Sequence, residues 1–253
     1  MGSSGSQTTF NVGRALVAAT GEVRRQLLEL ASEELEAAPE DLELAGGAVR
    51  AKDAPDRSVA IEALAQKARD NGQMILGRGS PPVPPFPDNF GATCAGRTSF
   101  PAFAAPAFCC HAARVKVDRE TGVARVLEVA AAHDFGRVLN PAGAEGQVEG
   151  GVVHGAGMAL TEGTAYEAGR QLNPHLLDYK LQTAADAPRI QVVFVDAPDP
   201  NGGPKGSKGV GEPPVVPTAG AIGNAIARAT GARVHRLPMT PYRVFAAMQG
   251  EEA

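Results

Sequence analysis

A helix unusually rich in glycine is the feature that most constrains the fold of this chain. The stretch over 140–163 opens with Asn140 as an expected cap and Pro141 at the first helical position. It nevertheless carries six interior glycines, which are Gly143, Gly146, Gly150, Gly151, Gly155 and Gly157. Each costs roughly 0.5–1 kcal/mol relative to alanine in a helix interior. We therefore expect another backbone, or a ligand, to lie close against this helix.

The other predicted elements mix helices with hairpins. Apolar residues at spacings of three and four predict helices, and alternating residues about glycine turns predict hairpins. In chain order we expect an amphipathic helix over about 12–36, a hairpin about Gly46 and Gly47, a helix capped by Ser58 and ended by Asn71 and Gly72, a hairpin about Glu120-Thr121-Gly122, a strand at 190–196, and a helix from about Pro214 to Thr230 closed by Gly231. This order predicts the α+β class, with mixed helices and antiparallel hairpins and no regular βαβ repeat.

Composition excludes several kinds of partner. The chain has 253 residues of which 43% are hydrophobic, enough for a buried core. Its net charge of -4 offers no basic face for nucleic acid, and no apolar run approaches the roughly 18 residues that a membrane helix needs. Three cysteines without CxxC spacing predict neither a disulfide framework nor a thiolate metal site. We expect a cytoplasmic protein that binds neither nucleic acid nor membrane.

The loop “GSKGVGEPPVVPT” at 206–218 places one carboxylate, Glu212, between glycines and prolines. Nucleotide-binding loops are excluded by spacing, because the loop lacks GxxxxGK[ST] and no GxGxxG follows a strand. Taken alone, Glu212 is most simply a carboxylate that caps the following helix. However, Pro213 and Pro214 stiffen the chain, and Gly209 and Gly211 allow backbone to approach a ligand. A carboxylate held so in an apolar pocket could act as a general base.

This loop resembles the active-site loop of the molybdenum hydroxylases, the family of xanthine dehydrogenase, aldehyde oxidoreductase and the N-heteroaromatic hydroxylases. The similarity continues through “AAHDFGRVLNPAGAEGQVEGGVVHGAG”, “LNPHLLDYKLQTAADAP” and “ATGARVHRLPMTPYRV”, which with the loop cover most of 106–248. The match is to the C-terminal part of a molybdopterin-binding subunit. It implies a molybdopterin-binding core with the glutamate loop at 106–253. Residues 1–105 would form a helical region with an N-terminal cofactor loop, a hairpin and a Pro/Gly-rich linker.

The resemblance implies a reaction and a role for two residues of the core. Glu212 would be the general base in a hydroxylation that inserts water-derived oxygen into an electron-poor carbon of an N-heteroaromatic ring or an aldehyde. Gln147, in “EGQVEGG”, matches the family glutamine whose amide reaches the molybdenum centre or its pterin. Without the motif, Gln147 would be interpreted as a polar helix residue bonded to nearby backbone.

The resemblance also implies cofactor-binding residues at both ends of the chain. Gly211 would lie against the cofactor beside the base. The N-terminal “GSQTTFNVGRAL” resembles the family loop and helix start that hold the phosphate or dithiolene region of the cofactor, and its residues are Ser6, Gln7, Thr8 and Thr9. Hydroxyls and amides before a helix suit an anion. The alternative is a disordered terminus in which a threonine merely caps the helix.

The expected cofactor is molybdopterin, either plain or as the cytosine dinucleotide, with no metal ligand from this chain. Iron–sulfur clusters and FAD are expected on partner chains. Because the resemblance covers only part of a molybdenum subunit, a larger molybdenum-subunit chain should complete the active site, and this chain should be inactive alone. A truncated fragment would share these features. Two other functions stay open, a noncatalytic assembly or scaffolding subunit and an unrelated anion-binding module.

Other candidate residues are expected to be structural. His154 stands where relatives often have glutamine, and we predict a packed core histidine. His133 and Asp134 belong to “HDFGRVLNP”, which resembles a structural turn of the family in which Asp134 and Asn140 bond backbone. Lys205 and Lys208 could attract an anionic group, although solvated loop lysines are the commoner arrangement.

Overall fold

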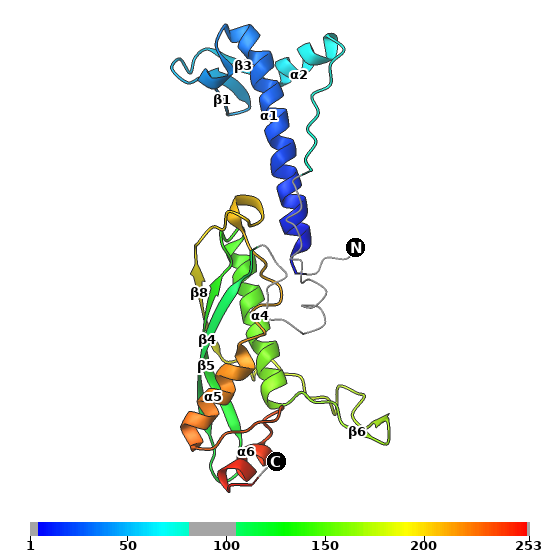
Figure 1. Ribbon diagram of the computed structural model, residues 1–253, viewed down its shortest axis with the longest axis vertical. Coiled ribbons are helices and arrows are strands. Elements are labelled where there is room, and N and C mark those ends of the chain that lie inside the picture. Colours follow the sequence, from blue (N-terminus) through cyan, green and yellow to red (C-terminus); the bar gives the residue numbers. More distant parts are fainter. Residues whose placement is uncertain (1–4, 81–104, 252–253) are drawn as a thin grey trace, which may run out of the picture. The chain divides into compact units, whose positions relative to one another are not determined.

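The computed structural model describes residues 5–80 and 105–251 of the chain. The chain divides into two compact units, Gln7–Phe86 and Met1–Ser6 with Pro87–Ala253 (Figure 1). No helix in the described ranges reaches the length and apolarity required to cross a lipid bilayer.

The unit over 7–86 packs two helices on a small sheet. Its elements are η1 (Thr8–Val12), α1 (Gly13–Leu35), η2 (Pro39–Asp41), β1 (Leu42–Ala45), β2 (Ala48–Ala51), β3 (Ser58–Ala60) and α2 (Ile61–Asp70). The strands pair antiparallel in the order β1-β2-β3. Leu28 of α1, Val49 of β2 and Leu64 of α2 are buried in one cluster. The predicted long helix and the hairpin about Gly46 and Gly47 are confirmed.

The predicted start of the second helix was wrong. Ser58 does not cap α2 but begins β3, where it pairs with Arg50 of β2. Ala60 precedes the helix and makes no side-chain cap bond. The free edge of β2 offers backbone hydrogen bonds to this segment, which outweigh the local preference of serine for a cap position. The helix ends as expected, at Asn71 and the left-handed Gly72.

The second unit is a three-stranded sheet covered by helices. Its elements are β4 (Phe108–Val117), β5 (Ala124–Asp134), α4 (Pro141–Leu160), β6 (Tyr166–Glu167), β7 (Arg170–Gln171), β8 (Arg189–Val195), η3 (Pro204–Gly206), α5 (Thr218–Thr230) and α6 (Pro241–Met248). The sheet order is β4-β5-β8, with β4 antiparallel and β8 parallel to β5. The α+β class and its antiparallel hairpins are confirmed, and the parallel β5–β8 pairing through α4 is an addition that the sequence pattern did not predict.

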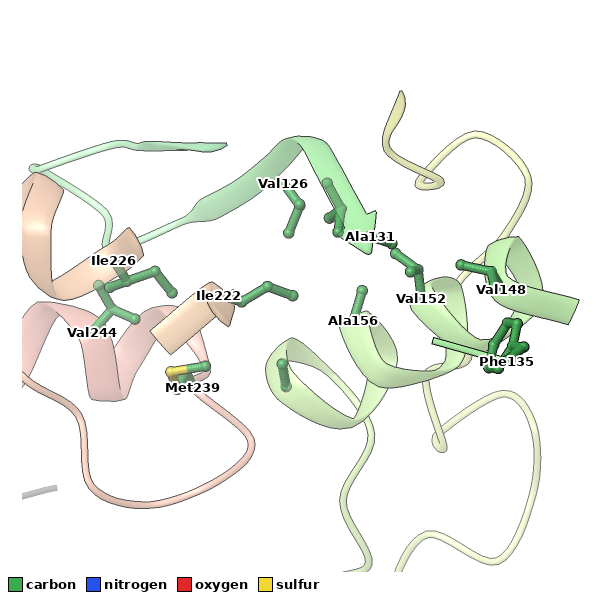
Figure 2. Close-up of a cluster of buried hydrophobic side chains, with 12 residues drawn as sticks. Val126, Ala131, Phe135, Val148, Val152, Ala156, Ile222, Ile226, Met239 and Val244 are labelled. Carbon is green, nitrogen blue, oxygen red and sulfur yellow. The ribbon is translucent and has the colours of Figure 1, made fainter. Parts of the chain in front are cut away.

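One face of this sheet forms the core. Figure 2 shows side chains of β5, α4 and α5 meeting in a single buried cluster. Its labelled members include Val126 and Ala131 of β5, Val152 and Ala156 of α4, and Ile222 of α5. These strand residues alternate with outward-facing ones, so the helices cover only one side of the sheet.

The opposite face of the sheet is apolar at one end of the strands. Register places Phe108, Asp134 and Val195 in one outward row, and Cys110, Ala132 and Val193 in the next. Phe108 is 64% exposed, Val193 45% and Val195 47%. Outward positions of a sheet that faces water are normally polar. Within the described part of the chain, this face is therefore incompletely covered.

Four of the six glycines of α4 fall into two groups. A Cβ at Gly151 would lie 2.5 Å from the Cβ of Pro214, and one at Gly155 would lie 2.5 Å from the Cβ of Thr218. These two glycines therefore allow α4 to approach the backbone of 214–218. This confirms the prediction that another backbone lies close against the glycine-rich helix. A Cβ added at Gly146 or Gly150 would meet no described atom within 4 Å, so these two glycines present open helix backbone.

We predict opposite effects for alanine at neighbouring glycines of α4. Gly151→Ala should lower the free energy of unfolding by about 1–3 kcal/mol, because the new methyl group would overlap Pro214. Gly150→Ala, the matched control, should raise it by about 0.5–1 kcal/mol, because only helix propensity changes there. Denaturant unfolding of the full chain measures both, and equal effects would contradict the packing described.

Candidate functional site

The segment that carries Glu212 is a pair of turns and not the first turn of a helix. The predicted helix start at Pro214 was wrong, since α5 begins at Thr218. Val215 N donates to Glu212 O at 3.1 Å, and Val216 N donates to Pro213 O at 3.3 Å. Pro217 explains the late start, because its ring disfavours a helical conformation at the preceding residue and blocks the carbonyl four positions earlier.

The loop before Glu212 is fixed to the end of β5 by backbone bonds. Lys208 N donates to Phe135 O at 2.8 Å, and Arg137 N donates to Gly206 O at 3.2 Å. Gly136 has φ +60°, and a Cβ there would lie 2.1 Å from Gly206 O. Only glycine allows this approach, so the “HDFGR” turn and the glutamate loop form one backbone-paired structure.

A buried ion pair supports the same junction. Lys208 Nζ lies 2.7 Å from Asp134 Oδ2, and the two side chains are 6% and 17% exposed. Lys208 is therefore not a solvated loop lysine, and the commoner arrangement that we weighed for it was wrong. The predicted backbone bond of Asp134 is confirmed, since its Oδ1 accepts from Gly136 N at 3.0 Å. Lys205, in contrast, is exposed.

Two further contacts bring distant predicted residues to the loop. Gln147 Nε2 donates to Gly211 O at 2.7 Å, directly before Glu212. Val210 N donates to Ser6 Oγ at 3.1 Å. Ser6, Gln147, Gly211 and Glu212 therefore lie around one stretch of backbone, although 204 residues separate Ser6 from Val210.

The remaining N-terminal candidates belong to the other unit. Gln7 is the residue before η1 and accepts from Asn11 Nδ2 at 2.6 Å. Thr8 and Thr9 lie inside the π-helical turn η1 and are exposed. The cap position of η1 is Gln7, which makes no side-chain cap bond, so neither threonine caps the helix.

His154 is exposed, so the prediction of a packed core histidine was wrong. On α4 it lies four residues after Gly150 and seven after Gln147, which places all three on one helical face. The core-facing residues of α4, such as Val148 and Val152, occupy a different face. The open face of α4 is thus lined by glycine backbone, Gln147 and His154.

The described residues do not enclose Glu212. The side chain is exposed. A hollow of about 400 Å³ lies elsewhere in the same unit, lined by residues that include Leu127, Leu160 and Met239 but neither Glu212 nor Gln147. Within the described ranges, no group of three or more His, Cys, Asp or Glu residues could hold a metal ion.

Sequence reasoning missed a buried polar chain behind the glutamate segment. His111 Nε2 lies 2.8 Å from His133 Nε2, and His111 Nδ1 lies 3.0 Å from Thr218 Oγ1. His133 and Thr218 are fully buried. The sequence did contain a signal for this pair. Side chains alternate between the two faces of a strand, and both histidines occupy positions of the predicted hairpin that face inward together with apolar residues.

Comparison with known proteins defines the class. Residues 1–188 match the family model of the molybdopterin cofactor-binding domain. The chain therefore belongs to the molybdopterin cofactor-binding domain family. The resemblance to the molybdenum hydroxylases is confirmed by the names of its relatives.

Each relative is considerably longer than this chain. The xanthine dehydrogenase molybdenum-binding subunit of Escherichia coli O157:H7 is 42% identical over 142 residues, 55% of this chain and 19% of the relative. The 6-hydroxypseudooxynicotine dehydrogenase complex subunit gamma of Paenarthrobacter nicotinovorans is 33% identical over 264 residues, 99% of this chain and 30% of the relative. Quinoline 2-oxidoreductase from Pseudomonas putida 86 is 27% identical with a TM-score of 0.76, covering 94% of this chain and 30% of that structure. This chain thus spans less than a third of each protein.

We predict that the two lysines of the loop contribute unequally to stability. Lys208→Met should lower the free energy of unfolding by about 3 kcal/mol, because it leaves Asp134 largely buried without its partner. Lys205→Met, the control in the same loop, should change it by less than about 0.5 kcal/mol. Chemical denaturation measures both, and a Lys208 variant no less stable than the Lys205 variant would show that the ion pair contributes little.

Proposed function

We propose that this chain supplies one side of the active site of a molybdenum hydroxylase, with Glu212 as its general base. The observation that carries this proposal is the 2.7 Å bond from Gln147 Nε2 to Gly211 O. It joins the helix motif “EGQVEGG” to the loop motif “GSKGVGEPP” immediately beside the carboxylate. Two motifs separated by 64 residues therefore meet where the family resemblance implies one site.

The residues gathered at this site fit a molybdopterin, plain or as the cytosine dinucleotide. Ser6 Oγ accepts from Val210 N and keeps its own proton for an acceptor on the cofactor. Among the described residues, the atom nearest to a Cβ added at Gly211 would be Ser6 Oγ at 3.9 Å, which leaves space for a flat ligand beside this part of the loop. The amide oxygen of Gln147 and the open backbone at Gly150 add neutral polar groups suited to a pterin. Gln7, Thr8 and Thr9 are proposed to hold its phosphate or dithiolene region.

Glu212 would act by taking a proton from the attacking water at one of its carboxylate oxygens. The bound molybdenum cofactor supplies the two-electron oxidation and activates the water whose oxygen is inserted. The turns over 212–216 and the two prolines restrict the backbone beneath the carboxylate. Such positioning is what general-base catalysis requires, since proton transfer needs hydrogen-bond contact. The substrate class would be an aldehyde or an N-heteroaromatic ring with an electron-poor carbon.

A larger molybdenum-subunit chain is proposed to close the site. Glu212 is exposed here, and the outward sheet face bears the exposed apolar residues Phe108, Val193 and Val195. Interfaces between permanent partners are hydrophobic in this way. The chain also spans less than a third of its relatives. We place the molybdopterin-binding core at 106–253, the N-terminal cofactor loop within 1–105, and iron–sulfur clusters and FAD on further partner chains.

We predict that the isolated chain is inactive and does not retain molybdopterin, because the residues gathered here cover only one side of a ligand. Metal analysis and pterin fluorescence on the purified chain measure this. The complex purified with its larger partner is the control and should contain the cofactor. One equivalent of molybdenum and pterin on the chain alone would refute the proposal of a divided site.

We predict that Glu212→Gln in the assembled complex lowers turnover about 10²–10⁴-fold, the usual contribution of a general base. The variant keeps the size of the side chain but cannot accept the proton. Steady-state turnover of an aldehyde or an N-heteroaromatic substrate measures the loss, and pterin content should be unchanged.

Glu120→Gln is the matched control for that experiment. Glu120 is exposed in the turn between β4 and β5, remote in sequence from the loop. Its variant should turn over substrate as the parent does. Unchanged turnover in Glu212→Gln, with cofactor retained, would instead support a noncatalytic assembly or scaffolding subunit.

A further inference from the structure

Buried His133 and half-buried His111 lie in a continuous chain of polar contacts that ends at the segment carrying Glu212. His133 of β5 contacts His111 of β4 through their Nε2 atoms at 2.8 Å, and His111 Nδ1 contacts Thr218 Oγ1 at 3.0 Å. Thr218 Oγ1 in turn donates to Pro214 O at 3.1 Å. The remaining nitrogen, His133 Nδ1, is buried and has no hydrogen-bond partner among the described residues.

Counting protons limits the chain to two directions. In the first, His133 Nε2–H donates to His111 Nε2, His111 Nδ1–H donates to Thr218, and the threonine hydroxyl donates to Pro214 O. In the second, the threonine hydroxyl donates to His111 Nδ1, and His111 Nε2–H donates to His133 Nε2. A neutral imidazole carries one N–H and one acceptor nitrogen, so each direction fixes the tautomer of both histidines.

The unpaired nitrogen of His133 selects the first direction. There, His133 Nδ1 is an acceptor without a donor. In the reverse direction it would be a buried N–H without an acceptor, and Pro214 O would lose the threonine hydroxyl. The reverse direction thus leaves a buried N–H unpaired and takes a donor from Pro214 O, whereas the first leaves only one acceptor nitrogen unpaired, and buried N–H groups without partners are rare in proteins. The chain therefore runs from His133 towards the proline carbonyl.

Prolines make this carbonyl important to the loop. Pro213 and Pro214 have no N–H of their own, so each of these residues can make main-chain hydrogen bonds only through its carbonyl oxygen. Pro213 O accepts from Val216 N at 3.3 Å and from Cys109 Sγ at 3.5 Å. Pro214 O accepts from Thr218. The donors that hold the two prolines therefore come from β4, from the turn itself and from the end of the histidine chain.

We infer that His111 and His133 are positioning residues, a neutral and directional relay that holds Thr218 on Pro214 O and so fixes the backbone that presents Glu212. Its link to catalysis rests on the proposed function, whereas the relay itself does not. The His133 ring stacks on Phe135 with centroids 4.8 Å apart, and the His111 ring meets His133 edge-on with centroids 5.0 Å apart.

The electrostatics agree with two neutral rings. Burial, with a further contribution from the nearby His133, lowers the pKa of His111 to about 4. Burial also lowers the pKa of His133. A proton added to His111 Nε2 would face the Nε2–H of His133 across 2.8 Å and break the contact between the rings. One added to His133 Nδ1 would have no acceptor among the described residues, so both rings are expected to be neutral.

Long-range ¹⁵N–¹H NMR of the full chain labelled at histidine tests the relay directly. At neutral pH we expect His111 protonated at Nδ1 only and His133 protonated at Nε2 only. The reverse tautomers, or a charged imidazolium at either ring, would overturn the inference.

Matched variants of Thr218 test whether the relay fixes the loop. Thr218→Val keeps the shape but removes the hydroxyl, whereas Thr218→Ser keeps the hydroxyl. Amide hydrogen exchange at Val215 and Val216 should accelerate at least about tenfold in the valine variant and much less in the serine variant. Equal exchange in the two variants would overturn the positioning role. If the valine variant does not fold, the tautomers of the unsubstituted chain still test the existence and direction of the relay.

In the assembled complex the same pair separates this inference from the proposed function. Thr218→Val should lower kcat by about tenfold with little change in KM, because the base is displaced but not removed, and serine should restore it. If Glu212→Gln leaves turnover unchanged, the proposed function fails while the NMR and exchange results stand. If Glu212→Gln abolishes turnover but both Thr218 variants match the parent, only the positioning role fails.

Discussion

The close approach of α4 to the segment over 214–218 is the constraint on which the candidate site depends. At Gly151 and Gly155 any side chain would overlap Pro214 or Thr218, so the contact exists only because these positions have none. The same approach places Gln147, one turn earlier on α4, within hydrogen-bond distance of Gly211. The glycines that weaken the helix by propensity are therefore what bring its polar residue to the loop.

Polar groups buried around the loop are matched in pairs or chains. Lys208 neutralises Asp134 where the loop joins β5, and the histidine relay reaches Pro214 from beneath the segment. A buried charge or polar group that loses its partner costs folding free energy. The ion pair and the relay therefore allow few alternative arrangements of the loop backbone that lies between them. The carboxylate of Glu212 is exposed, but the backbone that carries it is fixed by contacts on both sides in sequence, at Lys208 and at Pro214.

Local pattern was sufficient for most elements and insufficient for most of the site. Periodicity and glycine turns predicted the helix over 13–35 and both hairpins, because these signals depend on neighbours in sequence. Ser58 was assigned to a cap because the strand edge that it joins is formed by other residues. Lys208 and His154 were misplaced for the same kind of reason, since burial of a loop lysine and exposure of a helix histidine are decided by tertiary packing. The family motifs predicted Gln147 and Glu212 as site residues, but no motif marks the His111–His133 pair.

The bond between Ser6 and Val210 has a consequence for how the protein is made. It closes a loop of 204 residues, and the entropic cost of closure rises with loop length. During synthesis the N-terminal end leaves the ribosome first, so the nascent chain holds Ser6 long before Val210 exists. The glutamate loop therefore gains this tether only after Val210 has been made. A nascent chain stalled just before that residue would contain the helix motif and the sheet but not this bond.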